Sequence, residues 1–207
     1  MFTGFINNTY IESAPIFGTL SALRKRLTQL INIMKKQISL SLLLVGLLFS
    51  MTLMAQENDD KSKRPSPPAK AEGVADGVKI VIDYSKPSAK GRKMLGGNEP
   101  FGKVWRTGAN EATTFEVDKN VKIEGKELPK GKYALFTIPG ENEWTIIFNK
   151  TANQWGAYEY KEVDDALRVT VKPEKTDKFV ETFTISVEGN KVVLRWENTQ
   201  VAFAVKG

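Results

Sequence analysis

The sequence Val78-Lys79-Ile80-Val81-Ile82-Asp83-Tyr84 places a large apolar side chain at every second position. Successive side chains of a strand point to opposite faces of a sheet, so this period of two predicts a β-strand with one buried face. The same alternation returns in residues 113–117, 144–148, 167–171, 183–187, 192–196 and 201–205. Residues 133–138 are apolar on both sides, which predicts a strand buried between two layers.

Short turn sequences separate these stretches. They are Glu124-Gly125-Lys126, Pro129-Lys130-Gly131, Pro139-Gly140-Glu141-Asn142 and Glu188-Gly189-Asn190. Strands of this length joined by such turns are typical of all-β domains. We therefore predict a single antiparallel β-sandwich over residues 74–207, with a jelly-roll-like or barrel-like arrangement as the alternative. An N-terminal hydrophobic helix and a disordered linker are expected to precede it.

The composition excludes several kinds of catalytic and metal site, because the 207 residues include no cysteine and no histidine. Disulfides, thiolate nucleophiles and iron–sulfur clusters are excluded, and so are Ser-His-Asp triads and the common zinc sites. We expect no metal and no cofactor, and the sequence identifies no catalytic residue. Acid–base chemistry would fall to carboxylates, lysine or tyrosine.

The basic charge lies mostly near the N-terminus. Residues 1–55 hold five basic residues against Glu12 alone, whereas the remaining residues hold 25 basic and 23 acidic side chains. The body is therefore close to neutral and shows no arginine cluster that would neutralise phosphates. We expect no nucleic-acid partner.

An uncharged run lies between Lys36 and Glu57, and residues 38–54 within it are rich in apolar side chains. A secretory signal peptide has three parts, namely a basic N-terminal region, an apolar middle region and a small residue before the cleavage site. We predict a signal peptide over residues 34–55, cleaved after Ala55, although Leu53 is larger than the usual small residue at its position. The protein would then be periplasmic or secreted.

A retained membrane anchor is the alternative, because the apolar run approaches the length that spans a bilayer. Contact with a membrane would then occur only through this uncleaved segment. Residues 1–33 precede a normal signal start, and we interpret them as a start-site artefact or an extended basic region.

Residues 56–73 are predicted to be a disordered linker. The stretch is polar, contains Pro65, Pro67 and Pro68, and offers no apolar face to offset the entropy of ordering.

The segment from Asp83 to Glu111 departs from simple alternation and carries five glycines between residues 91 and 108. Long loops on a β scaffold often hold binding groups. The candidate ligand-binding residues here are Trp105, Arg106, Asn110 and Glu111, because a guanidinium, an amide and a carboxylate together can bind polar ligands. The alternative is an internal Arg–Glu or Arg–Asn clamp that holds the loop to the body.

Trp155 and Tyr158 extend this candidate site, because exposed aromatic faces stack on sugar rings or peptide side chains. The expected partner is a small molecule, a glycan or an envelope protein. The alternative is that these aromatic residues, with Tyr160, cap one end of the sandwich.

Three weaker patterns suggest other chemistry. Asp83 with Glu111 could form a glycosidase pair, which needs one carboxyl group with a raised pKa. The acids Glu162, Asp164 and Asp165 could contribute to a calcium site but lack EF-hand spacing. A Ser–Lys nucleophile formed by Ser85 or Ser88 with Lys90 would require a desolvated lysine, which this polar loop does not favour.

Several motifs resemble one known family. They are Tyr84-Ser85-Lys86-Pro87-Ser88, the run from Gly102 to Thr113, Leu128 to Tyr133, Thr137 to Gly140, Trp144 to Asn149, Gln154 to Tyr158 and Glu181 to Ile185. Together they resemble the DUF2911 family over roughly residues 66–206. The resemblance implies an exported all-β protein of a Gram-negative bacterium, and it implies no activity and no catalytic residue.

Three functions follow as hypotheses. The first is a non-enzymatic exported sandwich that binds a ligand or an envelope partner. The second is a carboxylate-based hydrolase of glycans or peptides, and the third is a purely structural accessory domain. A hollow that contains Arg106, Glu111 and Trp155 would favour binding or catalysis, whereas complete pairing and burial of these side chains would favour the structural role.

Overall fold

The computed structural model describes residues 16–54 and 60–207, and the chain divides into two compact units, Met1–Asp59 and Asp60–Gly207. Within the first unit, helix α1 (Ile16–Met54) confirms the expected N-terminal helix. It runs without a break across the boundary predicted at residue 34. Within the two described ranges, no helix combines the length and the apolar character that crossing a bilayer requires. The predicted cleavage point at Ala55 lies outside the described residues, so the signal peptide stays a prediction.

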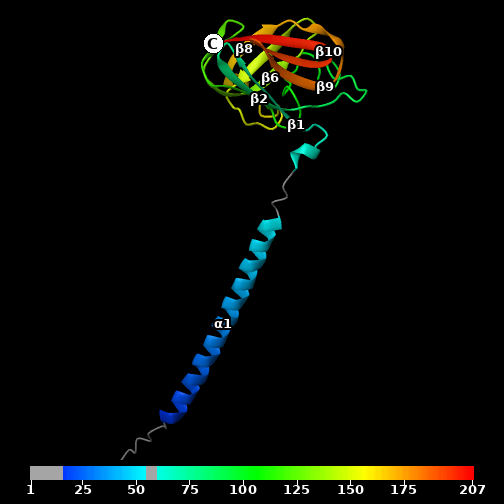
Figure 1. Cartoon of the computed structure of the whole chain (residues 1–207). Coiled ribbons are helices and arrows are strands. Elements are labelled where there is room, and N and C mark those ends of the chain that lie inside the picture. The colour runs from blue at the N-terminus through cyan, green and yellow to red at the C-terminus, as the bar shows by residue number, and fades with distance from the viewer. Residues whose placement is uncertain (1–15, 55–59) are drawn as a thin grey trace, which may run out of the picture. The chain divides into compact units, whose positions relative to one another are not determined.

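The second unit is a sandwich of two antiparallel sheets, which confirms the predicted fold class (Figure 1). The larger sheet has the order β1 (Pro68–Ala75), β2 (Val78–Ser85), β3 (Thr113–Val117), β6 (Gly131–Ile138), β7 (Trp144–Asn149) and β8 (Asp165–Val171). The smaller sheet has the order β5 (Lys126–Leu128), β4 (Val121–Ile123), β10 (Lys191–Lys206) and β9 (Glu174–Glu188). Two short 3-10 helices, Lys61–Lys63 and Glu162–Asp164, complete the described elements of this unit.

The core lies between the sheets and is rich in aromatic side chains. Phe115 from the larger sheet packs edge-to-face against Phe148 and against Phe203 of the smaller sheet. At the other end, Trp196 packs on Phe183 with ring centroids 5.7 Å apart. Trp144 and Trp196 are both buried, as their places in alternating stretches predict.

A second apolar cluster covers the outer face of the larger sheet. Its buried members are Ala112, Ala134, Phe136 and Ile147, and Val104, Ala157 and Tyr160 pack against them. The segments that lead into β3 and follow β7 therefore lie over β6. This cover confirms that residues 133–138 are buried on both sides, and it places the candidate site above the sheet.

The predicted linker over residues 56–73 is wrong for residues 60–73, because β1 begins at Pro68 and pairs along its length with β2. Proline is tolerated there because β1 is the edge strand of its sheet. Backbone pairing, rather than a row of large apolar side chains, orders this segment. The stretches at 192–196 and 201–205 likewise form one strand, β10, whose register shifts around Glu197.

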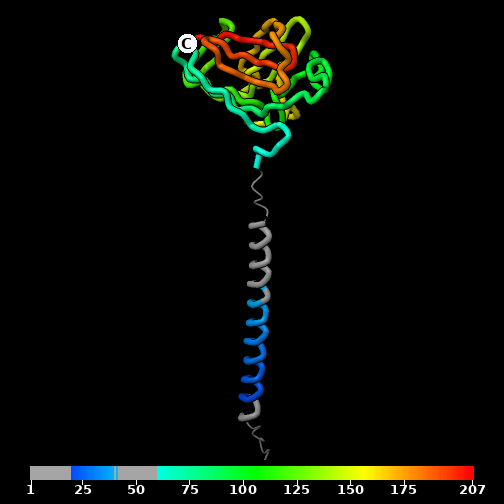
Figure 2. Tube along the Cα trace, turned by 45° about the vertical axis from the view of Figure 1, so that its right-hand side comes forward, coloured from blue at the N-terminus to red at the C-terminus, as the bar shows by residue number. Residues whose placement is uncertain are grey.

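Figure 2 shows β9 and β10, in orange and red, crossing one face of the body. The turn at Glu188-Gly189-Asn190 joins them, as predicted. The loop between β2 and β3 lies at one end of the sandwich in both views.

Candidate functional site

A short ladder brings the two candidate segments together. Glu111 pairs with Trp155 in an antiparallel bridge. The amide of Ala112 donates to the carbonyl of Gln154 at 3.0 Å, and the amide of Gly156 donates to the carbonyl of Asn110 at 3.1 Å. We call residues 110–112 and 154–156 the ladder. Since the hydrogen bonds flank the Glu111–Trp155 pair, these two side chains project from the same side at close range.

The aromatic side chains next to the ladder are exposed. Trp155 is 55% exposed and Tyr158 is 81% exposed, whereas the other three tryptophans, Trp105, Trp144 and Trp196, are at most 3% exposed. An indole face open to solvent is a surface on which a flat ligand can stack.

Glu111 is held by two cations that the sequence did not associate with it. Its carboxylate accepts from Lys61 Nζ at 2.9 Å and from Arg64 Nη1 at 3.0 and 3.1 Å. Partial burial acts to raise the pKa of Glu111, but the hydrogen bonds and charges of Lys61 and Arg64 outweigh it and lower the pKa to about 2. The carboxylate therefore stays ionised at neutral pH.

Arg106 and the ladder residue Asn110 are partly buried. Arg106 Nη1 donates to the carbonyl of Asn110 at 3.1 Å. Asn110 Nδ2 donates to Ser66 O at 2.9 Å and to Ser85 Oγ at 3.2 Å. These bonds match the predicted alternative of an Arg–Asn clamp, although the arginine uses the backbone carbonyl of the asparagine.

Gly156 allows Arg106 and Tyr158 to approach the ladder. A Cβ atom at this position would lie 3.0 Å from Arg106 Nη1 and 3.1 Å from the Tyr158 ring, and the backbone has φ +66°. A side chain here would be strained and would push the two neighbours outward.

Trp105 is a correction to the predicted site. It is 2% exposed, stacks on Trp196 with ring centroids 5.5 Å apart, and donates from Nε1 to the carbonyl of Gly108 at 3.0 Å. Its backbone pairs with Thr137 in a separate antiparallel bridge, and its indole belongs to the core cluster. Trp105 is therefore a core residue that anchors the loop and does not face a ligand.

A groove of about 230 Å³ opens beside Glu111. Its polar lining includes Lys61, Arg64, Asp83, Glu111, Thr114 and Lys132. Asp83 lies 3.8 Å from Lys132 Nζ and 3.5 Å from Lys70 Nζ. The hydroxyl of Thr114 is buried and has no hydrogen-bond partner within the described residues. The groove thus offers donors, acceptors and charges of both signs in one place.

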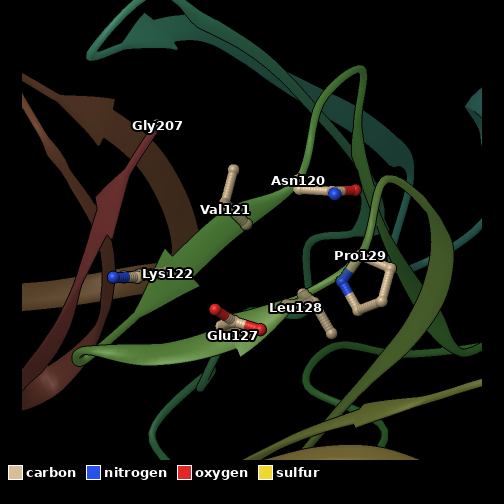
Figure 3. Close-up of a pocket in the computed structure, with 7 residues that line it drawn as sticks. All are labelled: Asn120, Val121, Lys122, Glu127, Leu128, Pro129 and Gly207. Carbon is tan, nitrogen blue, oxygen red and sulfur yellow. The ribbon is translucent and has the colours of Figure 1, made fainter.

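A second hollow of about 190 Å³ lies at the β4–β5 hairpin beside Gly207 (Figure 3). Lys122 and Glu127, which face each other across the hairpin, lie at its edge, and Val121 and Leu128 contribute apolar surface. None of the candidate residues from the sequence lines it.

Asp83 and Glu111, the possible glycosidase pair, line the same groove, whereas the other two weaker patterns do not assemble. Among the residues in the described ranges, no cluster of three acids could hold a metal ion. Asp165 instead accepts from Asn149, Tyr160 and Arg168. Ser85 is buried, whereas Lys90 is exposed to solvent.

Lys61 and Arg64 are the site residues that sequence reasoning missed. They belong to residues 60–67, which we call the strap, and this segment was predicted to be part of a mobile linker. Its fixed position comes from single contacts with distant partners, such as the amide of Lys86, which donates to the carbonyl of Pro67 at 3.0 Å. A polar composition by itself does not distinguish such a strap from a tether.

Comparison with known proteins adds one finding. The family model described as "Protein of unknown function (DUF2911)" matches residues 66–205, which is more than half of the chain. No curated protein and no solved structure matches the chain.

Proposed function

The chain belongs to the DUF2911 family, and we propose that its sandwich is a non-enzymatic module that binds a sugar ring at the ladder after export from the cytoplasm. The single observation that supports this function is the pair of Trp155 and Glu111, an exposed indole beside a carboxylate that is fixed and ionised.

The two side chains suit the two surfaces of a sugar. The indole offers a flat apolar face for the C–H groups of the ring. Because Glu111 is ionised, its oxygens can accept hydrogen bonds from hydroxyl groups. Lys61 and Arg64 hold the carboxylate in place, so little ordering would be required when a ligand binds.

The groove next to Glu111 supports the same ligand class. Asp83 can accept, Lys132 can donate, and the Thr114 hydroxyl can do both. Three cations and two carboxylates line the groove, so a neutral polyol suits it better than a strongly charged ligand. Trp155 and Arg106 do not line the groove, so the groove would be a second subsite that adjoins Trp155 through Glu111.

The ionised state of Glu111 excludes it as the general acid of a glycosidase. A glycosidase needs a carboxylic acid that is protonated near neutral pH. The pKa of Glu111 at about 2 leaves it unable to donate a proton there. Burial raises the pKa of Glu99, but Glu99 does not line the groove.

The test uses the exposure of Trp155. Collisional quenching by acrylamide acts mainly on exposed indoles, and the other three tryptophans are buried. We expect one of the oligosaccharides cellohexaose, maltohexaose or chitohexaose to protect the fluorescence from quenching. Trp155→Ala should abolish both the quenchable component and the affinity, measured by calorimetry.

Phe179→Ala is the matched control, because Phe179 is an exposed aromatic residue on β9 outside the site. It should bind as the unmodified chain does. Absence of binding to all three sugars would reject carbohydrate recognition, and cleavage of a sugar that is lost in Glu111→Gln would instead establish the hydrolase.

A further inference from the structure

The loop between β2 and β3 carries a concentrated positive charge. Residues 86–106 hold six basic side chains and one acidic side chain, although the body as a whole is nearly neutral. We call residues 86–106 the basic loop. The near-neutral average of the body therefore conceals an excess of acid elsewhere and an excess of base at one end.

The lysines of the basic loop are not neutralised by ion pairs. Lys90, Lys93 and Lys103 are exposed and Lys86 is half-buried. Within residues 16–54 and 60–207, no ion pair or hydrogen bond engages the ammonium groups of these four lysines. Elsewhere in the body, Lys70 and Lys132 each lie within 4 Å of a carboxylate.

Acidic residues near the loop bond to its backbone instead of to its lysines. The Glu197 carboxylate accepts from the amides of Met94 at 2.9 Å and Leu95 at 2.8 Å. Glu181 Oε1 accepts from the amide of Lys90 at 2.6 Å. Counting these two acids with the loop still leaves six positive charges against three negative ones.

The arginines of the loop are committed internally. Arg92 donates from Nε to the carbonyl of Ala89 and from Nη2 to the carbonyl of Ser88, both at 3.0 Å. Arg106 donates to Asn110. Both guanidinium groups keep their positive charge, but their donors are directed at backbone carbonyls. The lysine ammonium groups act as point charges and do not demand the paired geometry that a guanidinium recognises.

Exposed aromatic side chains accompany these lysines. Phe101, within the loop, is 36% exposed, and Phe179 is 51% exposed. Phe179 adjoins Val180, which pairs with the Glu197 that holds the loop. Lysines beside exposed phenylalanines are the combination that binds at the interface of an anionic membrane, where charges meet lipid headgroups and rings enter the boundary.

We propose that the basic loop docks the domain onto an anionic phospholipid surface. This contact is separate from any retained apolar segment at the N-terminus and independent of the proposed sugar site. Lysines without directional partners suit a diffuse sheet of headgroup charge, and the rigid attachment of Met94 and Leu95 keeps the charges together without a ligand.

The experiment measures co-sedimentation of the full chain with vesicles of phosphatidylcholine containing 30% phosphatidylglycerol, at low salt. Lys90→Glu/Lys93→Glu/Lys103→Glu should weaken binding on the order of 100-fold, because each lysine near such a surface contributes to affinity. Binding should also fall as sodium chloride is raised, because screening shortens the range of the attraction.

The matched control is Lys122→Glu/Lys172→Glu/Lys191→Glu, which makes the same change in net charge at exposed lysines outside the loop. It should change the affinity less than threefold. The apolar segment at residues 38–54 is present in every variant, so its contribution cancels. Equal losses in both triple variants, or no loss in the loop variant, would overturn the proposal. If the loop variant lost binding to soluble dextran sulfate but kept its binding to vesicles, the proposal would also be overturned.

Discussion

Glu111 is the residue where the strap, the ladder and the groove meet. Its backbone pairs with Trp155, and its carboxylate contacts Lys61 and Arg64, which precede it by about fifty residues. The two cations therefore do two things. They fix the N-terminal end of the body, and they set the ionisation of the group that the proposed ligand would meet.

The ionisation of Glu111 predicts a pH-dependent contribution to stability. The pKa falls from 4.5 to about 2 on folding, so the contribution is present above pH 4.5 and is lost as the pH falls toward 2. The side chain is 39% exposed, so solvent screening reduces the contribution to about 1 kcal/mol. Glu111→Gln should lower the free energy of unfolding by this amount at pH 7 and by almost nothing near pH 2.

Urea denaturation at pH 7, 4 and 2.5 measures this difference. Glu188 also has its pKa lowered to about 2, by Arg195 and Ser186, but it is present in both proteins and cancels in the comparison. Glu127→Gln, at an exposed position on β5, controls for the removal of a charge. A stability difference that is constant over the whole pH range would contradict the ion-pair explanation.

The tryptophans show how far sequence predicts single residues. Trp144 and Trp196 occur in alternating stretches, and the period places them in the core correctly. Trp105 and Trp155 occur in loops where no period applies, and one is buried while the other is exposed. Whether each is buried depends on contacts with residues distant in sequence, such as the contact of Trp105 with Trp196.

At the scale of elements, the register shift around Glu197 links the hairpin of β9 and β10 to the basic loop. Glu197 has φ +52°, an unusual backbone conformation for a side chain of this type, and its carboxylate leaves the sheet to accept from Met94 and Leu95. The register shift therefore has a structural role, because it directs the Glu197 carboxylate toward the amides of Met94 and Leu95.

Glu197→Gln tests this link. An amide side chain has one acceptor oxygen, so it can replace one of the two bonds at most. We expect hydrogen exchange at the Met94 and Leu95 amides to accelerate roughly 10-fold, because the loop opens locally more often. The amide of Phe148 in β7 serves as the internal control and should exchange at an unchanged rate. Unchanged exchange at both loop amides would show that the carboxylate does not hold the loop.

Strands with large apolar side chains at alternate positions were predictable from the sequence, whereas strands without this pattern were not. Thr113–Val117 forms β3 with the predicted bounds, and Trp144–Asn149 extends its prediction by one residue. In contrast, β1 contains mainly small and charged residues, so no apolar pattern indicates it. Its alignment comes from pairing with β2 and from Gly73, where a Cβ atom would lie 2.6 Å from Val187 of the other sheet.

At the scale of the whole molecule, the sandwich begins earlier than its composition suggests. The strap adds ion pairs to Glu111, its Ser66 carbonyl accepts from Asn110, and its Pro67 carbonyl accepts from the amide of Lys86. The fold class follows from local periods, but a domain boundary is set by such long-range contacts, which a single sequence does not display. The strap is accordingly part of the domain and one wall of its groove.

Comparison of two truncated chains, residues 60–207 and residues 68–207, tests this boundary. Removal of the strap takes away the partners of Glu111 and Asn110 together, and we expect the free energy of unfolding in urea to fall by about 2 kcal/mol. A third chain, residues 60–207 with Lys61→Ala and Arg64→Ala, separates the side-chain contacts from the backbone contacts and should lose about half as much. Identical midpoints for the two truncated chains would show that the strap lies on the domain without stabilising it.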